Sequence, residues 1–317
     1  MSILVIGGMG FIGSRIAKML MDQGEEVVVM GRRPTLHRLT EVADRVKAVK
    51  ADKANIEEII DLIRVHRVKK VVDVSYELEG ESEQAPYSAS KLNLLGTLNV
   101  FEACRIMGVR RIVWASSMAV YGDKRRAQGI PQDEESMNHP ITVYGICKTH
   151  GEFMAKLYNA RWDMDVVCLR PGGVYGPLRA SGLTSWLTDM VKLPLAGQPV
   201  NVPPGPEETM NLSFVDDCAA AFVTCCQHPG DRLPHSVYNL GGYRATVREL
   251  IEEVKKHIPE ARAHFMGKYV YYLDTVDNRR LQQDTGFQHQ YDLAAGVAVQ
   301  VARQRALDEA EKSKQIR

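Results

Sequence analysis

The chain has 317 residues, and its 40 basic side chains are nearly balanced by 39 acidic ones, which gives a net charge of +1. Without a basic surplus it lacks the electrostatic character of a nucleic-acid-binding protein, so we expect no nucleic-acid partner. At this length and 45% hydrophobic content, the chain can bury a large core in one or two lobes. No apolar run reaches the roughly 18 residues of a membrane-spanning helix, and the first run is too short for a signal peptide. We therefore expect a cytoplasmic protein that does not contact membranes.

Buried-strand and helical patterns alternate along the first 170 residues. Short runs rich in Val and Ile predict strands, and the stretches between them predict helices. Strands that alternate with helices of this length form a parallel sheet covered on both faces, which is a doubly wound α/β fold. The expected strands are 3–6, 26–30, 46–49, 70–74, 111–115 and 165–170, and the expected helices are 11–23, 55–66, 92–107 and 143–160.

The pattern changes after Arg170. Seven prolines crowd residues 171–206, where regular periodicity is weak. Such a segment predicts loops and short helices over a site rather than further strands of the sheet. Residues 236–240 read as a strand that returns to the sheet, and the residues from Asp292 on predict a charged, amphipathic surface helix.

Several polar features are interpreted as structural rather than functional. The glutamates of residues 77–83 predict a solvated loop after the fourth strand, although substrate loops begin there in this type of fold. Asp216 and Asp217 precede a helix and are interpreted as its N-cap. The six cysteines stand in apolar surroundings without paired spacing, and the nine histidines lack metal-binding spacing. We therefore expect free buried thiols and no metal site.

A glycine pattern follows the first strand directly and opens the first helix. Gly7, Gly10 and Gly13 fit G-x-x-G-x-x-G, with Phe11 and Ile12 between the last two glycines. Such a turn lets the backbone approach a pyrophosphate and aims a helix N-terminus at its negative charge. The pattern in this position predicts dinucleotide binding, and a purely structural turn is the alternative.

The end of the second strand bears on which nucleotide is bound. An acidic residue normally closes this strand when it binds the ribose 2′-hydroxyl, and here Arg32 and Arg33 stand instead. Two guanidinium groups suit a 2′-phosphate, which favours NADP(H) over NAD(H). The alternative is that Arg32 stacks on adenine or is solvated. Asp52, past the third strand, is a candidate acceptor for the adenine amine, and a helix N-cap is an equal interpretation.

Tyr144 and Lys148 are four residues apart in a predicted helix, so both side chains lie on one face, one turn apart. A tyrosine hydroxyl titrates near ~10 in water and is a poor base at neutral pH. A neighbouring positive charge lowers that pKa toward the working range. The pair therefore predicts an acid/base site, although the spacing alone also occurs by chance.

These motifs follow one another in the order typical of extended short-chain dehydrogenases/reductases, and the chain resembles their epimerase/dehydratase-like branch over nearly its whole length. The resemblance implies a Rossmann fold and hydride transfer between a nicotinamide and a substrate carbon. It also implies a homodimer paired through the helices at 92–107 and 143–160. The segments that carry it are 7–13, Asn93, 115–122, Tyr144 with Lys148, 169–177 and 213–217.

The same resemblance assigns roles to individual residues. Tyr144 would exchange a proton with the substrate hydroxyl, and Lys148 would lower the Tyr144 pKa and bind the nicotinamide ribose. Ser117, rather than Ser116, would hydrogen-bond the substrate oxygen. Pro171 would contact the cofactor, and the remaining substrate contacts would be Tyr76, Met118, Gly172 and Gly173.

Two departures from the family pattern narrow the expected reaction. Sugar-nucleotide dehydratases carry an acidic pair where this chain has Met118 and Ala119, which cannot protonate a leaving hydroxide. Enzymes that bind nucleotide sugars usually have asparagine at the position of Gly173 and arginine near that of Met210, although Arg179 could replace the latter. The departures predict a smaller or less charged substrate.

The expected organisation is an α/β Rossmann fold, a doubly wound parallel sheet with a smaller, interleaved C-terminal lobe. Residues 1–170, with 212–258 returning to them, would form the NAD(P)-binding domain. Residues 171–211 and 259–317 would form the substrate-binding lobe.

The leading hypothesis is an NAD(P)(H)-dependent oxidoreductase, with NADP(H) favoured, that acts on a small or moderately apolar hydroxy/keto substrate. One alternative is a sugar or nucleotide-sugar epimerase that recycles a tightly bound cofactor. The other is a redox-sensing dinucleotide-binding protein without catalysis, which the presence of Ser117, Tyr144 and Lys148 disfavours.

Overall fold

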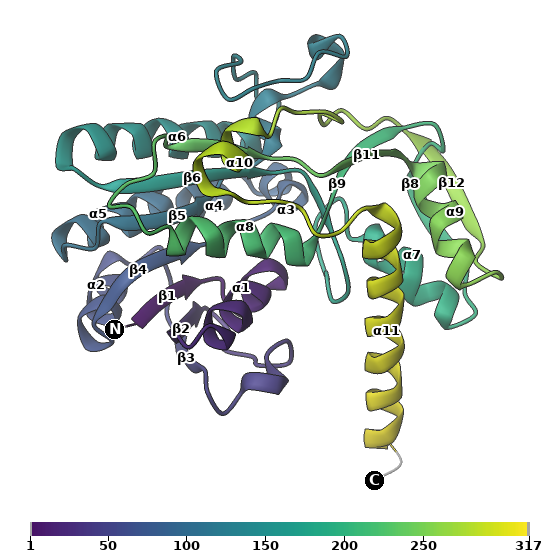
Figure 1. The fold of residues 1–317 in the computed structure, drawn as a ribbon, viewed down its shortest axis with the longest axis horizontal. Coiled ribbons are helices and arrows are strands. Elements are labelled where there is room, and N and C mark those ends of the chain that lie inside the picture. The colour runs from purple at the N-terminus through teal and green to yellow at the C-terminus, as the bar shows by residue number, and fades with distance from the viewer. Residues whose placement is uncertain (1, 316–317) are drawn as a thin grey trace.

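The computed structural model describes residues 2–315. Within this part of the chain, a seven-stranded sheet forms the centre of the molecule, and its neighbouring strands pair in parallel (Figure 1). The strand order β10-β6-β5-β4-β1-β2-β3 is that of a doubly wound Rossmann sheet, which confirms the predicted fold class. The strands are β1 (Ser2–Ile6), β2 (Glu26–Gly31), β3 (Lys47–Lys50), β4 (Val68–Asp73), β5 (Arg111–Ala115), β6 (Asp165–Pro171) and β10 (Val237–Leu240).

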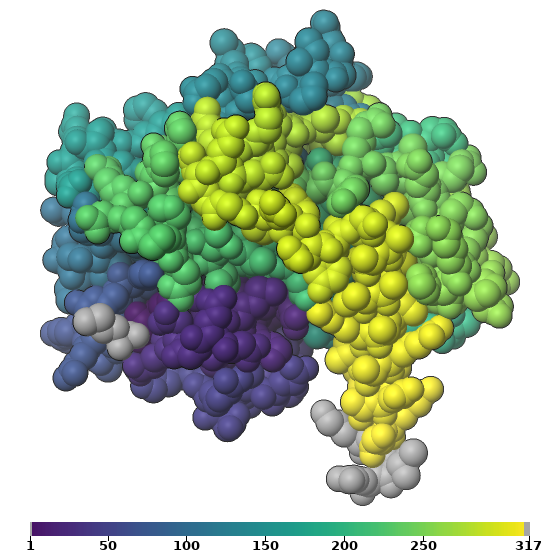
Figure 2. All heavy atoms as spheres, in the orientation of Figure 1, coloured from purple at the N-terminus to yellow at the C-terminus, as the bar shows by residue number. Residues whose placement is uncertain are grey.

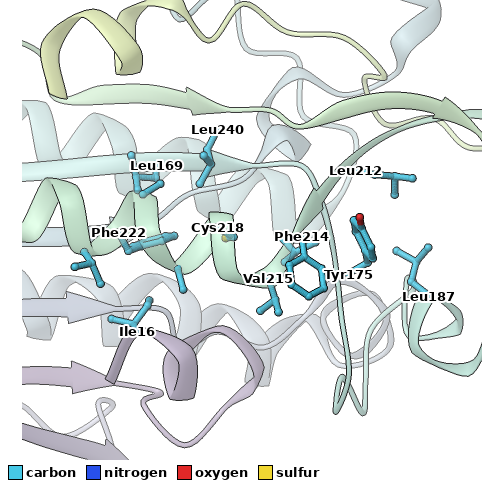
Figure 3. Close-up of a cluster of buried hydrophobic side chains, with 14 of the residues drawn as sticks. Ile16, Leu169, Tyr175, Leu187, Leu212, Phe214, Val215, Cys218, Phe222 and Leu240 are labelled. Carbon is cyan, nitrogen blue, oxygen red and sulfur yellow. The ribbon is translucent and has the colours of Figure 1, made fainter. Parts of the chain in front are cut away.

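Helices cover both faces of this sheet because its central strands are apolar on both sides. In β1, Ile3 and Val5 belong to one hydrophobic core, whereas Leu4 and Ile6 belong to a second. Successive side chains of a strand point to opposite faces, so such a strand needs a layer of helices on each. Figure 3 shows part of the first core, which extends from Ile16 of α1 and Phe222 of α8 to Leu187 in the segment after β6. The helices are α1 (Phe11–Asp22) and α8 (Val215–Gln227) on one face, and α2 (Ile56–Val65), α5 (Gly96–Ile106) and α6 (Val143–Trp162) on the other.

The predicted strands and helices of the central sheet are confirmed, with ends shifted by at most two residues, except the helix at 92–107. That helix begins instead with a π-helical turn, η2 (Lys91–Leu95), before α5. Asn93 lies buried in this turn and exchanges two hydrogen bonds, each 3.0 Å long, with the backbone N–H and C=O of Glu77. The turn therefore fixes the loop that follows β4. Two short helices occupy that loop, α3 (Glu79–Gln84) and α4 (Pro86–Ser90).

The segment after β6 is more regular than its sequence suggests. The prediction that residues 171–206 add no strand to the central sheet is confirmed. They hold more than loops and short helices, however, because they contain two strands of smaller sheets and a ten-residue helix. The prolines are tolerated since Pro204 ends a strand of a two-stranded sheet and Pro194 lies in the last turn of the helix. The elements are β7 (Gly173–Tyr175), α7 (Trp186–Leu195), β8 (Val200–Pro204) and β9 (Thr209–Phe214).

Later parts of the chain complete this second lobe. β11 (Tyr243–Thr246), β9 and β7 form a three-stranded sheet, and β12 (Ala263–Lys268) pairs with β8. α9 (Val247–His257) flanks them, whereas α10 (Arg279–Thr285) packs against β10 of the central sheet (Figure 1). Short 3-10 turns occur at η1 (Thr40–Val42), η3 (Met118–Tyr121) and η4 (Lys124–Ala127).

The C-terminal helix α11 (Leu293–Gln315) is not the simple surface helix that its charge suggests. Val297 and Val301 are fully buried, and the Gln300 side chain donates to the Leu187 carbonyl at 2.8 Å. Only its C-terminal half projects beyond the body of the molecule (Figure 2). Within the described residues, no helix combines the length and apolar character that crossing a bilayer would need.

Asp216 and Asp217 join the two lobes, and their interpretation as an N-cap is wrong. Phe214 occupies the N-cap position of α8, and both aspartates lie in its first turn. Asp216 forms ion pairs with Arg15 of α1 and Arg303 of α11. Asp217 accepts backbone hydrogen bonds from the segment that leads into α11. The helices α1, α8 and α11 are therefore joined through the Asp216 carboxylate.

Candidate active site

A groove of about 500 Å³ runs along the C-terminal edge of the sheet, where doubly wound folds bind ligands. It begins at the turn after β1 and passes the ends of β2, β4 and β5 to reach Tyr144. All of the predicted cofactor-binding residues except Lys148 line it. They are Gly7, Gly10, Phe11, Ile12, Gly13, Arg32, Arg33, Asp52 and Pro171.

The glycine turn after β1 leaves no room for side chains. Gly7 has a φ of +77°, and a Cβ on Gly13 would lie 2.1 Å from the Gly7 carbonyl oxygen. The N-cap of α1 is Gly10, and no side chain caps its free N–H groups. Exposed backbone N–H groups at a helix N-terminus bind phosphate. The turn therefore fits the pyrophosphate of a dinucleotide.

Arg32 and Arg33 follow β2 at the rim of the groove. Both side chains are exposed, and neither forms an ion pair within the described residues. They differ from Arg38, whose guanidinium donates to the Leu178 carbonyl at 2.8 Å. The first two arginines are thus available to a ligand in the groove.

Asp52 lies in the groove but does not cap a helix. Its Oδ1 accepts the N–H of Ala54 at 2.9 Å, and the N-cap of α2 is Asn55. The N-cap alternative is therefore wrong. That Asp52 accepts a hydrogen bond from the adenine amine stays a prediction.

Tyr144 and Ser117 meet at the inner end of the groove. Tyr144 lies in the first turn of α6, where Thr142 caps the helix by accepting the Gly145 N–H at 3.0 Å. Ser117 follows β5 and caps the 3-10 turn η3. The Ser117 hydroxyl lies near the Tyr144 hydroxyl and acts to lower the Tyr144 pKa. Ser116, in contrast, is buried and donates to Glu152 at 2.5 Å, away from Tyr144.

Lys148 lies on the same helix but its ammonium is directed elsewhere. Its Nζ donates to the Ala115 carbonyl at 2.5 Å and lies 3.2 Å from the centre of the Tyr76 ring. The side chain is 1% exposed and does not line the groove. Tyr76 covers it and packs edge-on against Tyr144, with ring centres 5.4 Å apart.

Burial, rather than a neighbouring positive charge, dominates the pKa of Tyr144 in this arrangement. Burial raises the pKa of Tyr144 to about 12, although the nearby Ser117 hydroxyl acts in the opposite direction. Burial and the nearby Lys53 ammonium hold the pKa of Lys148 well below its usual range. The Lys148 Nζ lies 5.3 Å from the centre of the Tyr144 ring but donates to the Ala115 carbonyl, so its effect on the Tyr144 pKa stays a prediction. Tyr144 is therefore a neutral phenol at pH 7 and suited to donate a proton.

A buried ion pair holds the strands and the helix of this site together. The Arg170 guanidinium on β6 binds both oxygens of Glu152 on α6, each at 2.7 Å. Glu152 also accepts from Ser116 at the end of β5, and Arg170 donates to the Tyr121 hydroxyl at 2.6 Å. Both charged side chains are at most 3% exposed. The pair thus fixes α6, which carries Tyr144, against the strand end that carries Ser117.

A second, smaller cavity of about 100 Å³ opens beside the groove. Ser117 and Tyr144 line both spaces, so the two hydroxyls lie where the spaces join. Of the predicted substrate residues, Met118, Gly172 and Gly173 also line this cavity, whereas Tyr76 lines only the groove. The Tyr76 ring lies over Lys148 and beside Tyr144, and its contact with a substrate stays a prediction.

Glu79 is a residue of this cavity that the sequence analysis assigned to a solvated loop. It is 7% exposed, and its Oε2 is shielded without a hydrogen-bond partner. Burial, with a smaller effect from Glu83, raises its pKa to about 7. Glu83, one turn later, accepts the Val143 N–H at 2.6 Å and so anchors α3 to the start of α6. The i, i+4 spacing of the two glutamates is the signal that both face α6.

The described residues contain no group of three or more His, Cys, Asp or Glu side chains that could hold a metal ion. All six cysteines are free and buried.

The chain matches known proteins over most of its length. The family model described as the NAD dependent epimerase/dehydratase family matches residues 3–241. A curated relative, the putative UDP-glucose 4-epimerase of Methanocaldococcus jannaschii, is 28% identical over 314 residues, which cover 93% of this chain and 95% of the relative.

Solved structures share the fold. A partial consensus L-threonine 3-dehydrogenase has a TM-score of 0.88 and 25% identity, covering 96% of this chain and all of that chain. The UDP-glucose 4-epimerase of Thermus thermophilus in complex with NAD has a TM-score of 0.85 and 25% identity, covering 96% of this chain and 99% of that one.

The raised pKa of Glu79 predicts a pH-dependent effect of Glu79→Gln on stability. The folded-state value of about 7 lies above the ordinary 4.5. Below pH 4.5 the carboxyl is protonated in both states, whereas above pH 7 its ionisation favours unfolding by ~3 kcal/mol. The variant should therefore gain stability over the wild type as the pH rises from 4.5 to beyond 7.

Urea unfolding at pH 5 and pH 8.5 measures this difference. Glu81→Gln, on the exposed side of the same helix, is the control and should follow the wild type at both pH values. If the difference in unfolding free energy between Glu79→Gln and the wild type stays constant with pH, the pKa of the Glu79 carboxyl is not raised.

Proposed function

The chain belongs to the NAD dependent epimerase/dehydratase family, and on this premise we propose that it is an oxidoreductase for a small hydroxy or keto substrate. The observation that carries the proposal is the position of Tyr144 and Ser117 at the junction of the groove and the small cavity. Hydride transfer requires a substrate carbon beside the nicotinamide and an acid or base beside the substrate oxygen. A nucleotide in the groove and a substrate in the cavity would meet these conditions.

The chemistry follows from the two hydroxyls. A bound nicotinamide supplies or accepts the hydride. In reduction, the O–H bond of Tyr144 breaks and its proton passes to the substrate oxygen, which Ser117 also hydrogen-bonds. In oxidation, the ionised form of Tyr144 accepts the proton of the substrate hydroxyl while the substrate carbon gives up hydride. The pKa of about 12 keeps Tyr144 protonated at neutral pH and favours its role as the donor.

The shape of the cavity supports a small substrate. Its volume is about 100 Å³. A Cβ on Gly172 would lie 2.6 Å from the Asn211 Oδ1, and one on Gly173 would lie 2.8 Å from the Asn211 carbonyl oxygen. The wall therefore excludes the asparagine that nucleotide-sugar enzymes usually place at the second glycine. The similar L-threonine 3-dehydrogenase is named for a substrate of this small size.

We propose NADP(H) as the preferred nucleotide, with NAD(H) as the alternative. Arg32 and Arg33 are unpaired within the described residues at the end of β2, where a ribose 2′-phosphate would be bound bidentately. The family description and the similar epimerase complex both specify NAD. The arginine pair is thus the observation that supports the phosphorylated nucleotide.

An epimerase is the second candidate, supported by the 28% identity to a putative UDP-glucose 4-epimerase. Such an enzyme returns the hydride to its substrate within each cycle. It would convert UDP-glucose to its epimer without a net change in reduced nucleotide. The oxidoreductase proposed here would leave UDP-glucose unconverted.

The chain is further proposed to form a homodimer through α5 and α6. These neighbouring helices expose several large apolar side chains that a second subunit would cover. The exposed residues are Ile106, Ile146, Phe153 and Trp162.

Tyr144→Phe should lower turnover by ~100-fold or more, because proton transfer loses its donor. Affinity for the nucleotide should stay unchanged, since the phenyl ring keeps its packing. Turnover is followed at the absorbance of the reduced nicotinamide with a panel of small hydroxy acids and ketones. Tyr87→Phe, at an exposed tyrosine, is the control, and full activity of Tyr144→Phe would refute the acid/base assignment.

Arg32→Asp should weaken NADP(H) binding by ~10-fold or more while changing NAD(H) binding far less, because a carboxylate repels the 2′-phosphate. Fluorescence titration with both reduced nucleotides measures the two affinities. Lys69→Asp controls for the change in net charge, because Lys69 lies near the start of β4, at the edge of the sheet opposite the groove. Equal losses for both nucleotides would contradict the preference for NADP(H).

Phe153→Glu should weaken the homodimer by ~10-fold or more, since it places a charge in a buried apolar contact. Light scattering over a concentration series should give twice the mass of the chain for the wild type and lower masses for the variant. Val65→Glu, at an exposed apolar residue of α2, should remain dimeric. A monomeric wild type would contradict the proposal.

A further inference from the structure

Two side chains of opposite charge line the small cavity without contacting each other. Glu79 enters it from the first residue of α3, and Arg179 from the loop after β7. Among the residues that the structure describes, no ion pair joins the two, and Glu79 has no charged partner. Tyr144 and Ser117 line the same cavity, so its walls carry a negative group, a positive group and two hydroxyls.

The Glu79 carboxylate lacks what a buried charge normally has. The residue is only 7% exposed, and Oε2 has neither solvent nor a hydrogen-bond donor within the described part of the chain. Burying a carboxylate without a donor or counter-ion is costly. Glu83 beside it, in contrast, is anchored to the Val143 N–H. A cationic ligand in the cavity would supply the missing partner of Glu79.

The Arg179 side chain is held in place by hydrogen bonds, but its positive charge has no acidic partner among the described residues. Its Nη1 donates to the Val174 carbonyl at 2.9 Å and its Nε to the Ser181 carbonyl at 3.2 Å. Both acceptors are neutral, so no carboxylate among the described residues offsets the charge. A positive charge this close to Tyr144 acts to lower the Tyr144 pKa. The guanidinium is therefore a fixed site for an anionic group near the reacting hydroxyl.

We propose that the substrate is a small hydroxy amino acid, whose ammonium group binds Glu79, whose carboxylate binds Arg179 and whose hydroxyl faces Tyr144 and Ser117. One zwitterionic ligand then pairs both charges of the cavity at once. A charge-assisted hydrogen bond in a shielded site is stronger than a neutral one. Glu79 is thus the residue that distinguishes an amino acid from the corresponding hydroxy acid. The inference rests on the proposed function, because it assigns that site its substrate class.

Equilibrium binding tests the role of Glu79 without depending on turnover. The probes are L-threonine and 3-hydroxybutanoate, which differ only in the amino group. Each is titrated calorimetrically into the protein with saturating NADPH, which cannot accept hydride from them, at pH 8. The wild type should prefer L-threonine by ~10-fold or more. Glu79→Gln should weaken L-threonine binding by ~10- to 100-fold and leave 3-hydroxybutanoate binding nearly unchanged. Glu81→Gln should retain the wild-type preference.

Threoninol, which has the amino group but no carboxylate, tests Arg179. Arg179→Met should weaken both L-threonine and 3-hydroxybutanoate but not threoninol. The nucleotide affinity of this variant is measured separately, since Arg179 also lines the groove. A loss confined to the nucleotide would overturn the assignment of Arg179 to the substrate carboxylate.

The outcomes separate this inference from the function on which it rests. Equal binding of L-threonine and 3-hydroxybutanoate, binding of neither, or a preference that survives Glu79→Gln would overturn the inference. Turnover of hydroxy acids with no such preference would leave the oxidoreductase intact and refute only the amino-acid class. Glu79-dependent binding of L-threonine without any hydride transfer would instead refute the oxidoreductase and support the binding site.

Discussion

The buried ion pair between Arg170 and Glu152 is the constraint on which the site depends. The two charged side chains have almost no solvent access, so they must stay paired, because a buried charge without its partner would cost several kcal/mol. To keep both carboxylate oxygens bound, α6 cannot slide along β6. Glu152 also binds Ser116, so the end of β5 is held by the same pair. The proximity of Tyr144 to Ser117 is thus a consequence of charge burial one layer beneath them.

The two spaces above that layer divide the chemistry between them. The groove offers backbone N–H groups and exposed arginines, which suit phosphates, and the cavity offers a carboxylate, a guanidinium and two hydroxyls. Tyr144 and Ser117 are among the residues that line both spaces. Lys148 lies beside Tyr144, covered by the Tyr76 ring. For Lys148 to bind a nicotinamide ribose, Tyr76 must turn away, so we expect the nucleotide to rearrange this pair of side chains.

What the sequence predicted well were features that depend on neighbours in the chain. Strand alternation and the glycine turn after β1 are set by side-chain size and backbone freedom within a few residues, and they are confirmed. The direction of the Lys148 ammonium depends on the Ala115 carbonyl, 33 residues away. The burial of Glu79 depends on α3 folding back on α6, and the burial of Val297 depends on α7 and α9. These contacts are non-local, so composition and periodicity alone gave a solvated loop and a surface helix.

The central claim is net hydride transfer from a substrate in the cavity to a nucleotide in the groove. Mass spectrometry of the free nucleotide after incubation with L-threonine deuterated at its hydroxyl-bearing carbon tests it most directly. We expect deuterium to accumulate in reduced nicotinamide nucleotide in solution, in proportion to the ketone formed. Conversion of UDP-glucose to its epimer, with no deuterium in the free nucleotide from any small hydroxy substrate, would contradict it.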